Sequence, residues 1–322
     1  MKLRRIYLIL LPLLMLTMAA GLCFGSAPLS LSELAAGEGT ARTILFGIRL
    51  PRVLAGALAG VGLSTAGVLL QTVTANDLAS PNIIGINSGA GLAVILMLTF
   101  APGAGTWLPL GAFCGAFGAA LVILAAGSRL GSSRSGILLI GIAITTLFNA
   151  VISFLSLLDE GILAQYNHFT VGSLRAIRLG ELLVPGIVIL AGFCAALALS
   201  GRLNVLCLGD AAAAALGIRV RGLRVAAMAC AAACAAAVVS FAGLLGFVGL
   251  VVPHIARALV GERPGKLIPV SALVGGILVI LADLLGRTLF APSELPVGIL
   301  MSLIGAPYFL ILLVRRKHHA GN

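Results

Sequence analysis

Residues 202–224 read RLNVLCLGDAAAAALGIRVRGLR, and they separate two long apolar runs at residues 181–199 and 225–245. A helix that crosses a bilayer needs about 20 mostly apolar residues, so each flanking run is long enough to span. The stretch between the runs carries several arginines, which are costly inside the hydrocarbon core of a membrane. Long apolar runs joined by short basic breaks predict a bundle of membrane-spanning helices.

The middle of this basic stretch predicts a short helix from Asp210 to Leu216. The carboxylate of Asp210 is expected to accept the free N–H groups of the first turn, and Gly217 suits the left-handed position after the last turn. Two membrane spans can be joined without such a helix. It is therefore either an incidental part of a long connection or a contact surface for another protein.

The composition identifies an integral membrane protein. The chain has 322 residues, of which 60% are hydrophobic and 10% are charged, and its mean hydropathy is +1.17. Soluble domains carry about 25% charged residues. The net charge of +11 does not indicate nucleic-acid binding, because the basic residues lie at the ends of apolar segments, where membrane topology explains them. The six cysteines are scattered without the His or carboxylate neighbours that a metal site needs, so we interpret them as packing residues.

The apolar runs predict about ten spans and therefore an all-α fold. We expect them at residues 6–24, 53–73, 84–100, 107–126, 136–158, 181–199, 225–245, 247–260, 267–289 and 296–314. The first run is long for a signal peptide and is interpreted as an uncleaved span. Residues 25–48 are predicted to form an outer segment with a short helix at 32–36, and residues 159–180 an outer loop.

An even number of spans places both termini on one side. Most Lys and Arg residues then fall on the termini's side, which the positive-inside rule assigns to the cytoplasm together with residues 202–224. Six arginines fall outside: Arg42, Arg49, Arg52, Arg175, Arg178 and Arg287. Three of them, Arg49, Arg52 and Arg287, lie directly at the outer ends of spans. They either snorkel to lipid headgroups or form a positive ring that docks acidic residues of an outer partner.

Polar and small residues mark the interior of the bundle. Gly56, Gly60 and Ser64 are four residues apart, a spacing that favours close helix packing. Gln71, Asn76 and Asp77 need partners or water at membrane depth, so residues 76–82 are expected to form a non-helical stretch at the inner mouth of a cavity. Residues 87–91 (NSGAG) are expected to form a second break. Asp283 and Arg287 have the (i, i+4) spacing of an ion pair within one helix. This pair either has a structural role or is part of a proton relay.

Motifs for catalysis are missing from the sequence. The segment GERPGK at 261–266 lacks the four-residue gap of a Walker A motif and has no Ser or Thr after Lys266. No Ser/His/Asp or HExxH arrangement occurs, and the four histidines are dispersed. We therefore expect a protein that does not hydrolyse ATP itself and is not an enzyme.

Several motifs together resemble one known family. They are RLPR at 49–52, Gln71 with NDLASPNIIGINSGAG at 76–91, LGDAAAAALGI at 208–218, GFVGLVVPHIAR at 246–257, LADLLGR at 281–287 and ELPVGILMSLIGAPYFLILLVRR at 294–316. In this order, and over nearly the whole chain, they are similar to the FecCD family of permeases, which serve ABC importers of iron-siderophores, haem and cobalamin.

The resemblance implies a type II ABC importer permease with a single transmembrane domain over residues 1–322 and both termini in the cytoplasm of a bacterium. Its implied partners are an ATPase dimer that binds ATP and Mg²⁺, a second permease subunit (an identical copy or a close paralogue), and a periplasmic or lipid-anchored substrate-binding protein. The chain itself is expected to bind membrane lipid but no cofactor, metal or nucleic acid.

The resemblance also implies roles for individual residues. Arg49, Arg52 and Arg287 match arginines that receive glutamates of the binding protein. The coupling segment, about 206–220, would contact the ATPase through Leu208, Gly209, Asp210, Ala214, Leu216, Gly217 and Ile218. Asn76, Leu78, Ser132 and Ser133 fall where cytoplasmic gates lie. This chain has Asn76-Asp77-Leu78-Ala79 where the family often has NPLA, so rigidity at the inner mouth is expected to differ.

The resemblance therefore implies import of a metal chelate, and the family's commonest substrates put Fe(III)-siderophore first, then haem, then cobalamin. The alternative is a stand-alone secondary carrier driven by an ion gradient, which would call for inverted repeats and buried charges. Asp283 is the one acidic residue well inside a predicted span, and no clear repeat is visible. An intramembrane enzyme would need a catalytic pair within the spans, and none is found.

Overall fold

The structure, a computed structural model, describes residues 3–26, 39–129 and 134–320. Within these ranges every regular element is a helix, as predicted. The elements are α1 (Leu3–Cys23), α3 (Gly39–Ile44), η1 (Leu45–Arg49), α4 (Leu50–Thr74), α5 (Ile86–Phe100), η2 (Gly105–Trp107), α6 (Leu108–Arg129), α7 (Arg134–Ser156), α8 (Glu160–Val171), α9 (Leu179–Leu206), α10 (Asp210–Ala215), α11 (Val220–Ala242), α12 (Val248–Val260), α13 (Pro264–Thr288) and α14 (Val297–Ala320). The short helix predicted at 32–36 lies outside the described residues.

The predicted spans coincide with the long helices. Seven helices of the described chain are long and apolar enough to cross a membrane, and Ile86–Phe100, Val248–Val260 and Val297–Ile311 are shorter apolar helices. Each predicted span falls on one of these ten segments. The fold is therefore an all-helical membrane bundle, and the short eighth span corresponds to α12.

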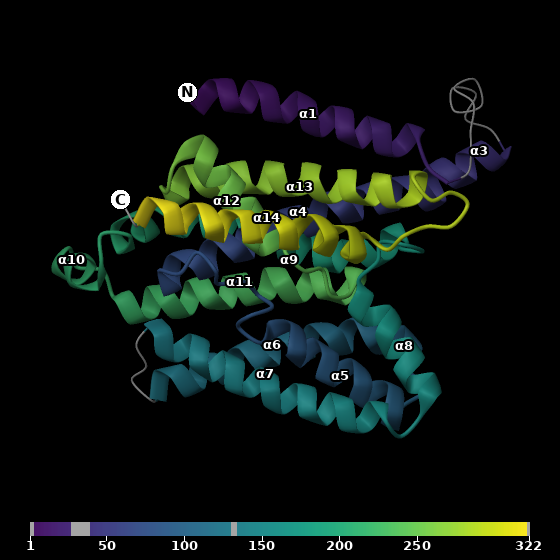
Figure 1. Cartoon of the computed structure of the whole chain (residues 1–322), viewed down its shortest axis with the longest axis horizontal. Coiled ribbons are helices and arrows are strands. Elements are labelled where there is room, and N and C mark those ends of the chain that lie inside the picture. Colours follow the sequence, from purple (N-terminus) through teal and green to yellow (C-terminus); the bar gives the residue numbers. More distant parts are fainter. Residues whose placement is uncertain (1–2, 27–38, 130–133, 321–322) are drawn as a thin grey trace.

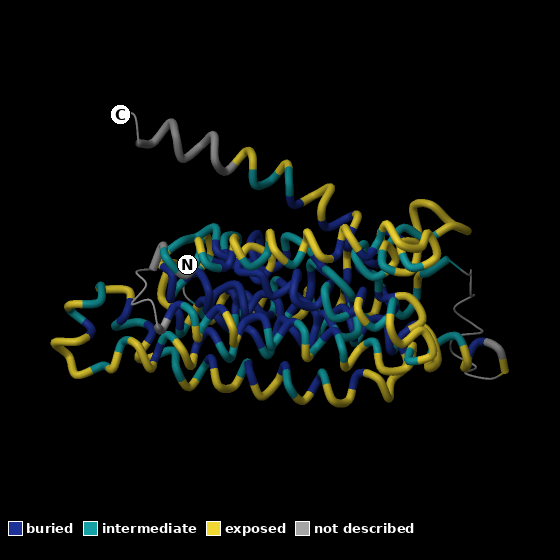
Figure 2. Tube along the Cα trace, turned by 90° about the horizontal axis from the view of Figure 1, so that it is seen from below, coloured by how far each residue is buried: buried dark blue, intermediate teal, exposed yellow. Residues whose placement is uncertain are grey.

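The core of the bundle is built around α4, which packs against α9, α11, α12 and α13. Close approach depends on the predicted small residues. A side chain at Gly60 would overlap the backbone of Gly275 on α13, and one at Gly67 would overlap the backbone of Gly249 on α12. Buried residues accordingly fill the middle of the bundle, while outward-facing turns are exposed (Figure 2). The predicted role of small residues in packing is confirmed.

The helices divide the molecule into two sides and two ends (Figure 1). α1 lies along α13 on one side, and α5, α6 and α7 pack together on the other. α10 projects from one end of the bundle, close to the end from which α1 starts and α14 finishes. α3 and α8 lie at the opposite end. The two termini therefore share an end with the basic stretch, as the even number of spans predicts.

Three local predictions need correction. Residues 159–180 were expected to form a loop, but Glu160–Val171 form helix α8, because the carboxylate of Asp159 accepts the N–H groups of Gly161 and Ile162 at the helix start. Residues 87–91 were expected to break the third span, but they are buried inside α5. α9 continues to Leu206, so Arg202 belongs to a helix and not to the connection.

The predicted non-helical stretch after α4 is present. Ala75 has a φ of 48° and ends α4, and residues 75–85 form turns before α5 begins. The side-chain amide of Gln71 donates to the carbonyl of Gly249 at 3.2 Å, which gives this buried polar residue a partner. Asp77 pairs with Arg257 of α12 at 3.3 Å. The break therefore brings polar side chains to one end of the bundle without leaving their charges unpaired.

Two cysteines of α11 pack against α9. Cys234 is buried, and a side chain at Gly192 would overlap its sulfur. The thiol of Cys230 lies 3.0 Å from the carbonyl oxygen of Gly192. These contacts agree with the interpretation of the cysteines as packing residues.

Candidate functional site

Three arginines that the sequence placed at the outer ends of spans lie together in the structure. Arg49 ends η1, Arg52 lies in the first turn of α4, and Arg287 lies in the last turn of α13. Their exposed fractions are 2%, 6% and 2%. A buried charge is stable only when it is paired and hydrogen-bonded, so the partners of these guanidinium groups define the site.

Arg52 is held by two carboxylates. Its Nε lies 2.9 Å from both carboxylate oxygens of Asp283, and its Nη1 donates to Glu294 at 2.8 Å. Arg287 also faces Asp283, at 3.5 Å, which is the predicted (i, i+4) pair. The closer partner of Asp283 is nevertheless Arg52 on another helix, so this pair ties α4 to α13.

Arg49 and Arg287 bind the end of α1. Arg49 donates to the carbonyls of Leu22 and Cys23 at 2.8 Å and 2.6 Å, and Arg287 donates to the carbonyl of Gly21 at 2.6 Å. The last carbonyls of a helix have no partner within it and carry the negative end of the helix dipole. Two cations at this position therefore satisfy the C-terminal end of α1 and fasten it to the bundle.

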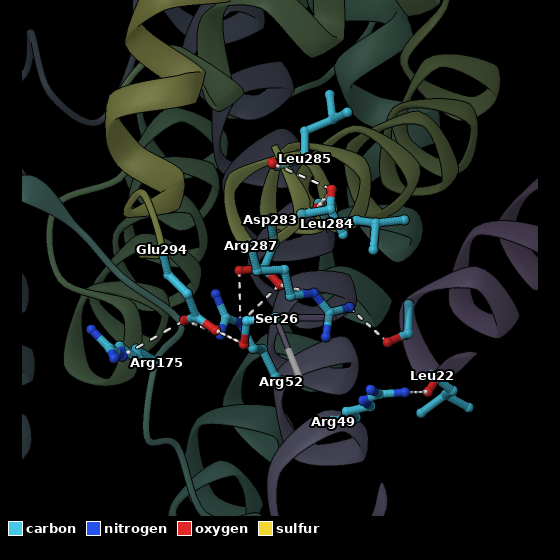
Figure 3. A network of polar contacts seen from close by, with 12 residues as sticks. Leu22, Ser26, Arg49, Arg52, Arg175, Asp283, Leu284, Leu285, Arg287 and Glu294 are labelled. Atoms are coloured by element: carbon cyan, nitrogen blue, oxygen red, sulfur yellow. Dashed lines mark hydrogen bonds and ion pairs between the residues drawn. The ribbon is translucent and has the colours of Figure 1, made fainter. Parts of the chain in front are cut away.

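Glu294 forms the rim of this charged cluster, as Figure 3 shows. It lies in the connection between α13 and α14, and its carboxylate accepts from Ser26 Oγ at 2.6 Å as well as from Arg52. Arg175, whose side chain is 70% exposed, faces the same carboxylate at 3.6 Å. Burial alone would raise the pKa of Glu294, but the hydrogen bonds from Ser26 and Arg52 and the charges of Arg52 and Arg175 together hold it below its usual value.

At the opposite end of the bundle, the predicted coupling segment forms helix α10 and its flanking turns. Gly209 and Gly217 have φ angles of 105° and 79°, a conformation that glycine adopts without strain. Leu208 and Leu216 on either side of α10 are 68% and 65% exposed. Ala213 is buried, whereas Ala214 is exposed and Ile218 is half-buried. The segment therefore presents apolar side chains outward.

Asp210 does not cap α10 as predicted. Gly209 is the N-cap residue, and no side chain caps the helix. The Asp210 carboxylate instead pairs with Nη2 of Arg224 on α11, at 2.6 Å and 2.8 Å from its two oxygens. The carboxylate is therefore engaged by a charge-assisted hydrogen bond from α11, which ties α10 to α11.

The predicted cytoplasmic gate is described only in part. Asn76 and Leu78 lie in the turns after α4 and are half-buried, and the side chain of Asn76 accepts the N–H of Leu78 at 2.9 Å. Ser132 and Ser133 lie outside the described residues.

Sequence reasoning missed three members of the charged cluster: Ser26, Arg175 and Glu294. Glu294 is 242 residues from Arg52 along the chain. Helical spacing reveals pairs within one helix, such as Asp283 and Arg287, but it contains no information on pairs between helices. The available signal was that Glu294, an acidic residue, lies in a short connection at the same predicted end of the bundle as Arg49, Arg52 and Arg287.

The fold defines a multi-pass helical membrane protein, with a charged cluster at one end and a projecting short helix at the other. A model of the FecCD transport family matches residues 13–315, and the chain belongs to this family. The iron(3+)-hydroxamate import system permease protein FhuG of Bacillus subtilis is 41% identical over 90% of this chain and 89% of its own length. The hemin transport system permease protein HmuU of Yersinia pestis is 38% identical over 85% of this chain and 84% of its own.

A solved structure agrees with this assignment. An ABC transporter described as of the metal-chelate type, in an inward-facing conformation, superposes with a TM-score of 0.89 and 31% identity over 97% of this chain and 99% of its own. The chain is thus the membrane-spanning permease subunit of an ABC importer, a transport subunit and not an enzyme. Membership in the family implies an ATPase and a substrate-binding protein as partners.

Proposed function

We propose that the chain carries an Fe(III)-siderophore complex across the bacterial cytoplasmic membrane, with haem and cobalamin as second and third candidates. The observation that supports the proposal is the family match over residues 13–315, together with a relative at 41% identity that is named for iron(3+)-hydroxamate import. A chelate is large, so selectivity would reside mainly in the binding protein. A stand-alone carrier driven by an ion gradient is not favoured, because the acid inside α13 is already paired with Arg52.

The energy for transport would enter through α10. We place this end of the bundle and both termini in the cytoplasm, in accordance with the positive-inside rule. The segment 206–220, with Leu208, Gly209, Asp210, Ala214, Leu216, Gly217 and Ile218, would seat in the ATPase. The exposed leucines on either side of α10 suit such a contact, because burying apolar surface against a partner is favourable.

The remaining assignments are part of the same proposal. The whole chain would form one permease domain and pair with a second copy or a close paralogue. ATP and Mg²⁺ would bind the ATPase, and this chain would bind no cofactor. Asn76, Leu78, Ser132 and Ser133 would contribute to the cytoplasmic gate. The end that carries Arg49, Arg52 and Arg287 would receive the binding protein.

Reconstitution tests this function. The chain would be placed in proteoliposomes with or without the ATPase and the binding protein, and uptake of a radioactive iron(III) hydroxamate would be measured. We expect uptake only when both partners and ATP are present. Uptake by the chain alone along an ion gradient would replace the importer with the secondary carrier. Parallel measurements with haemin and cobalamin would decide the cargo.

A further inference from the structure

Among the described residues, three arginines (Arg52, Arg175 and Arg287) face two carboxylates, those of Asp283 and Glu294. Arg49, Arg52 and Arg287 are buried together with Asp283, while Glu294 is 11% exposed and Arg175 is 70% exposed. Arg287 faces Asp283 at 3.5 Å, and Arg52 is held between Asp283 and Glu294. Arg175 is the exposed cation of this set, so its positive charge faces the surface and attracts carboxylates from outside.

Of the two carboxylates in this cluster, Glu294 is the one closer to the surface. Asp283 is 3% exposed and lies behind Arg52, whereas Glu294 lies between buried Arg52 and exposed Arg175 (Figure 3). An approaching carboxylate meets Arg175 first. To reach Arg52 it must take the place that the Glu294 carboxylate occupies.

We propose that Glu294 is an internal substitute for a carboxylate of the substrate-binding protein, which exchanges with it at Arg52 and Arg175 during docking. This inference rests on the proposed function of this end of the molecule. Glu294 would lower the affinity for any partner that lacks a carboxylate in the right place. Only a partner that carries such a carboxylate can replace the ion pair between Glu294 and Arg52. The residue would thus set specificity as well as affinity.

The exchange would act on the connection that precedes α14. Leu295 donates its N–H to the carbonyl of Gly286 at 2.9 Å, and Gly298 donates to the carbonyl of Gly172 at 3.1 Å. Gly172 lies at the end of α8, three residues before Arg175. The two surface connections that hold Glu294 and Arg175 are therefore fastened to one another at the start of α14. Release of Glu294 would loosen this junction when the partner binds.

A merely structural role for Glu294 predicts a different result. The bonds from Ser26 and Arg52 to Glu294 also hold the segment after α1 against the bundle. If that were their whole purpose, removing the carboxylate would lower stability and leave docking unchanged or weaker. Competition predicts instead that docking becomes tighter.

Affinity measurements on the permease–ATPase complex in lipid nanodiscs separate these roles. The probe is the purified substrate-binding protein encoded beside the permease. We expect Glu294→Gln to lower the Kd about tenfold. Ser26→Ala removes one hydrogen bond to the Glu294 carboxylate but leaves the carboxylate in place, so it should lower the Kd by less. Arg175→Gln should raise the Kd about fivefold or more, slow association and reduce its salt dependence. Arg178→Gln, an exposed arginine in the same connection, should leave the Kd unchanged.

The outcomes distinguish the inference from the function on which it rests. Absence of binding to the wild-type complex overturns the proposed docking end and this inference with it. Binding to the wild type that is unchanged or weaker in both Glu294→Gln and Ser26→Ala overturns the inference alone. If Glu294→Gln does not fold, as judged by its unfolding midpoint, the Ser26→Ala variant decides.

Discussion

Arg52 illustrates which pairings a sequence can reveal. Its partner Asp283 is 231 residues away along the chain, yet the two side chains lie 2.9 Å apart. The (i, i+4) spacing indicated the weaker pair with Arg287 and gave no sign of the shorter one. Asp210 was assigned to a helix cap for the same reason, because its partner Arg224 belongs to another helix. The spacing of residues along one helix predicts contacts within that helix. Where a charged side chain of another helix lies nearer, it becomes the partner instead.

Gly67 allows a first prediction at the scale of one residue. A Cβ at this position would overlap the backbone of Gly249, so Gly67→Ala should force α4 away from α12 and destabilise the protein by about 1–3 kcal/mol. The midpoint of thermal unfolding in detergent measures this effect. Gly118→Ala is the matched control, because nothing lies within 4 Å of a Cβ there. The control should be neutral or slightly stabilising, since alanine favours a helix more than glycine does. Equal effects at the two positions would contradict the close packing.

Glu294 allows a second prediction, on pH. Its pKa in the folded protein lies below its usual value, because the bonds from Ser26 and Arg52 and the nearby arginine charges outweigh its burial. The stabilisation from the Glu294 carboxylate is therefore complete above the pKa that this group has in the unfolded chain. It is lost as the pH falls through the lower pKa that the group has in the folded protein.

We expect the unfolding midpoints of the wild type and Glu294→Gln to differ near pH 6. They should converge as the pH drops below the usual range of glutamate, at about pH 4 and lower. The measurement is thermal unfolding of both proteins across this pH range in detergent. A difference that stays constant across the range would show that the carboxylate charge is not what stabilises the cluster.

At the scale of whole elements, apolar length predicted the spans well. A membrane helix must satisfy its backbone internally and face lipid, so its length and composition are fixed by the bilayer. Helix α8 was missed because it is short and mixed in polarity, although Asp159 followed by Glu160 was a usable start signal. The NSGAG segment was misjudged because its small polar residues are packing residues inside α5.

Helix α10 carries a prediction of its own. Leu208 and Leu216 are 68% and 65% exposed, so replacing either with Ser removes apolar surface without disturbing the bundle. We expect each variant to weaken association with the ATPase about tenfold or more and to leave the unfolding midpoint of the permease unchanged. Co-purification and binding of the ATPase to the permease in nanodiscs measure this.

Leu289 provides the control for these α10 variants. It is 64% exposed at the opposite end of the bundle, next to Arg287. Leu289→Ser should therefore bind the ATPase as the wild type does. If it weakened binding as much as the α10 variants, the coupling surface would not be specific to α10.

At the scale of the whole molecule, the two ends of the bundle differ in whether charged side chains are buried there. One end buries Arg49, Arg52 and Arg287 beside Asp283, whereas α10 projects from the other end, close to both termini. The charge bias of the sequence predicts that the α10 end faces the cytoplasm. Three of the arginines that break this bias, Arg49, Arg52 and Arg287, are buried and hydrogen-bonded, so their positions do not require the topology to be reversed.

Labelling of introduced cysteines tests this orientation. In a background without the six native cysteines, Leu208→Cys and Leu289→Cys place exposed thiols at opposite ends. If the charged-cluster end faces outward, as we propose, a membrane-impermeant maleimide should label Leu289→Cys in intact spheroplasts. It should label Leu208→Cys only in inside-out vesicles. Labelling of Leu208→Cys from outside would reverse the orientation and place the charged cluster in the cytoplasm. A binding protein could not then reach Glu294, and both the coupling and the docking assignments would fail together.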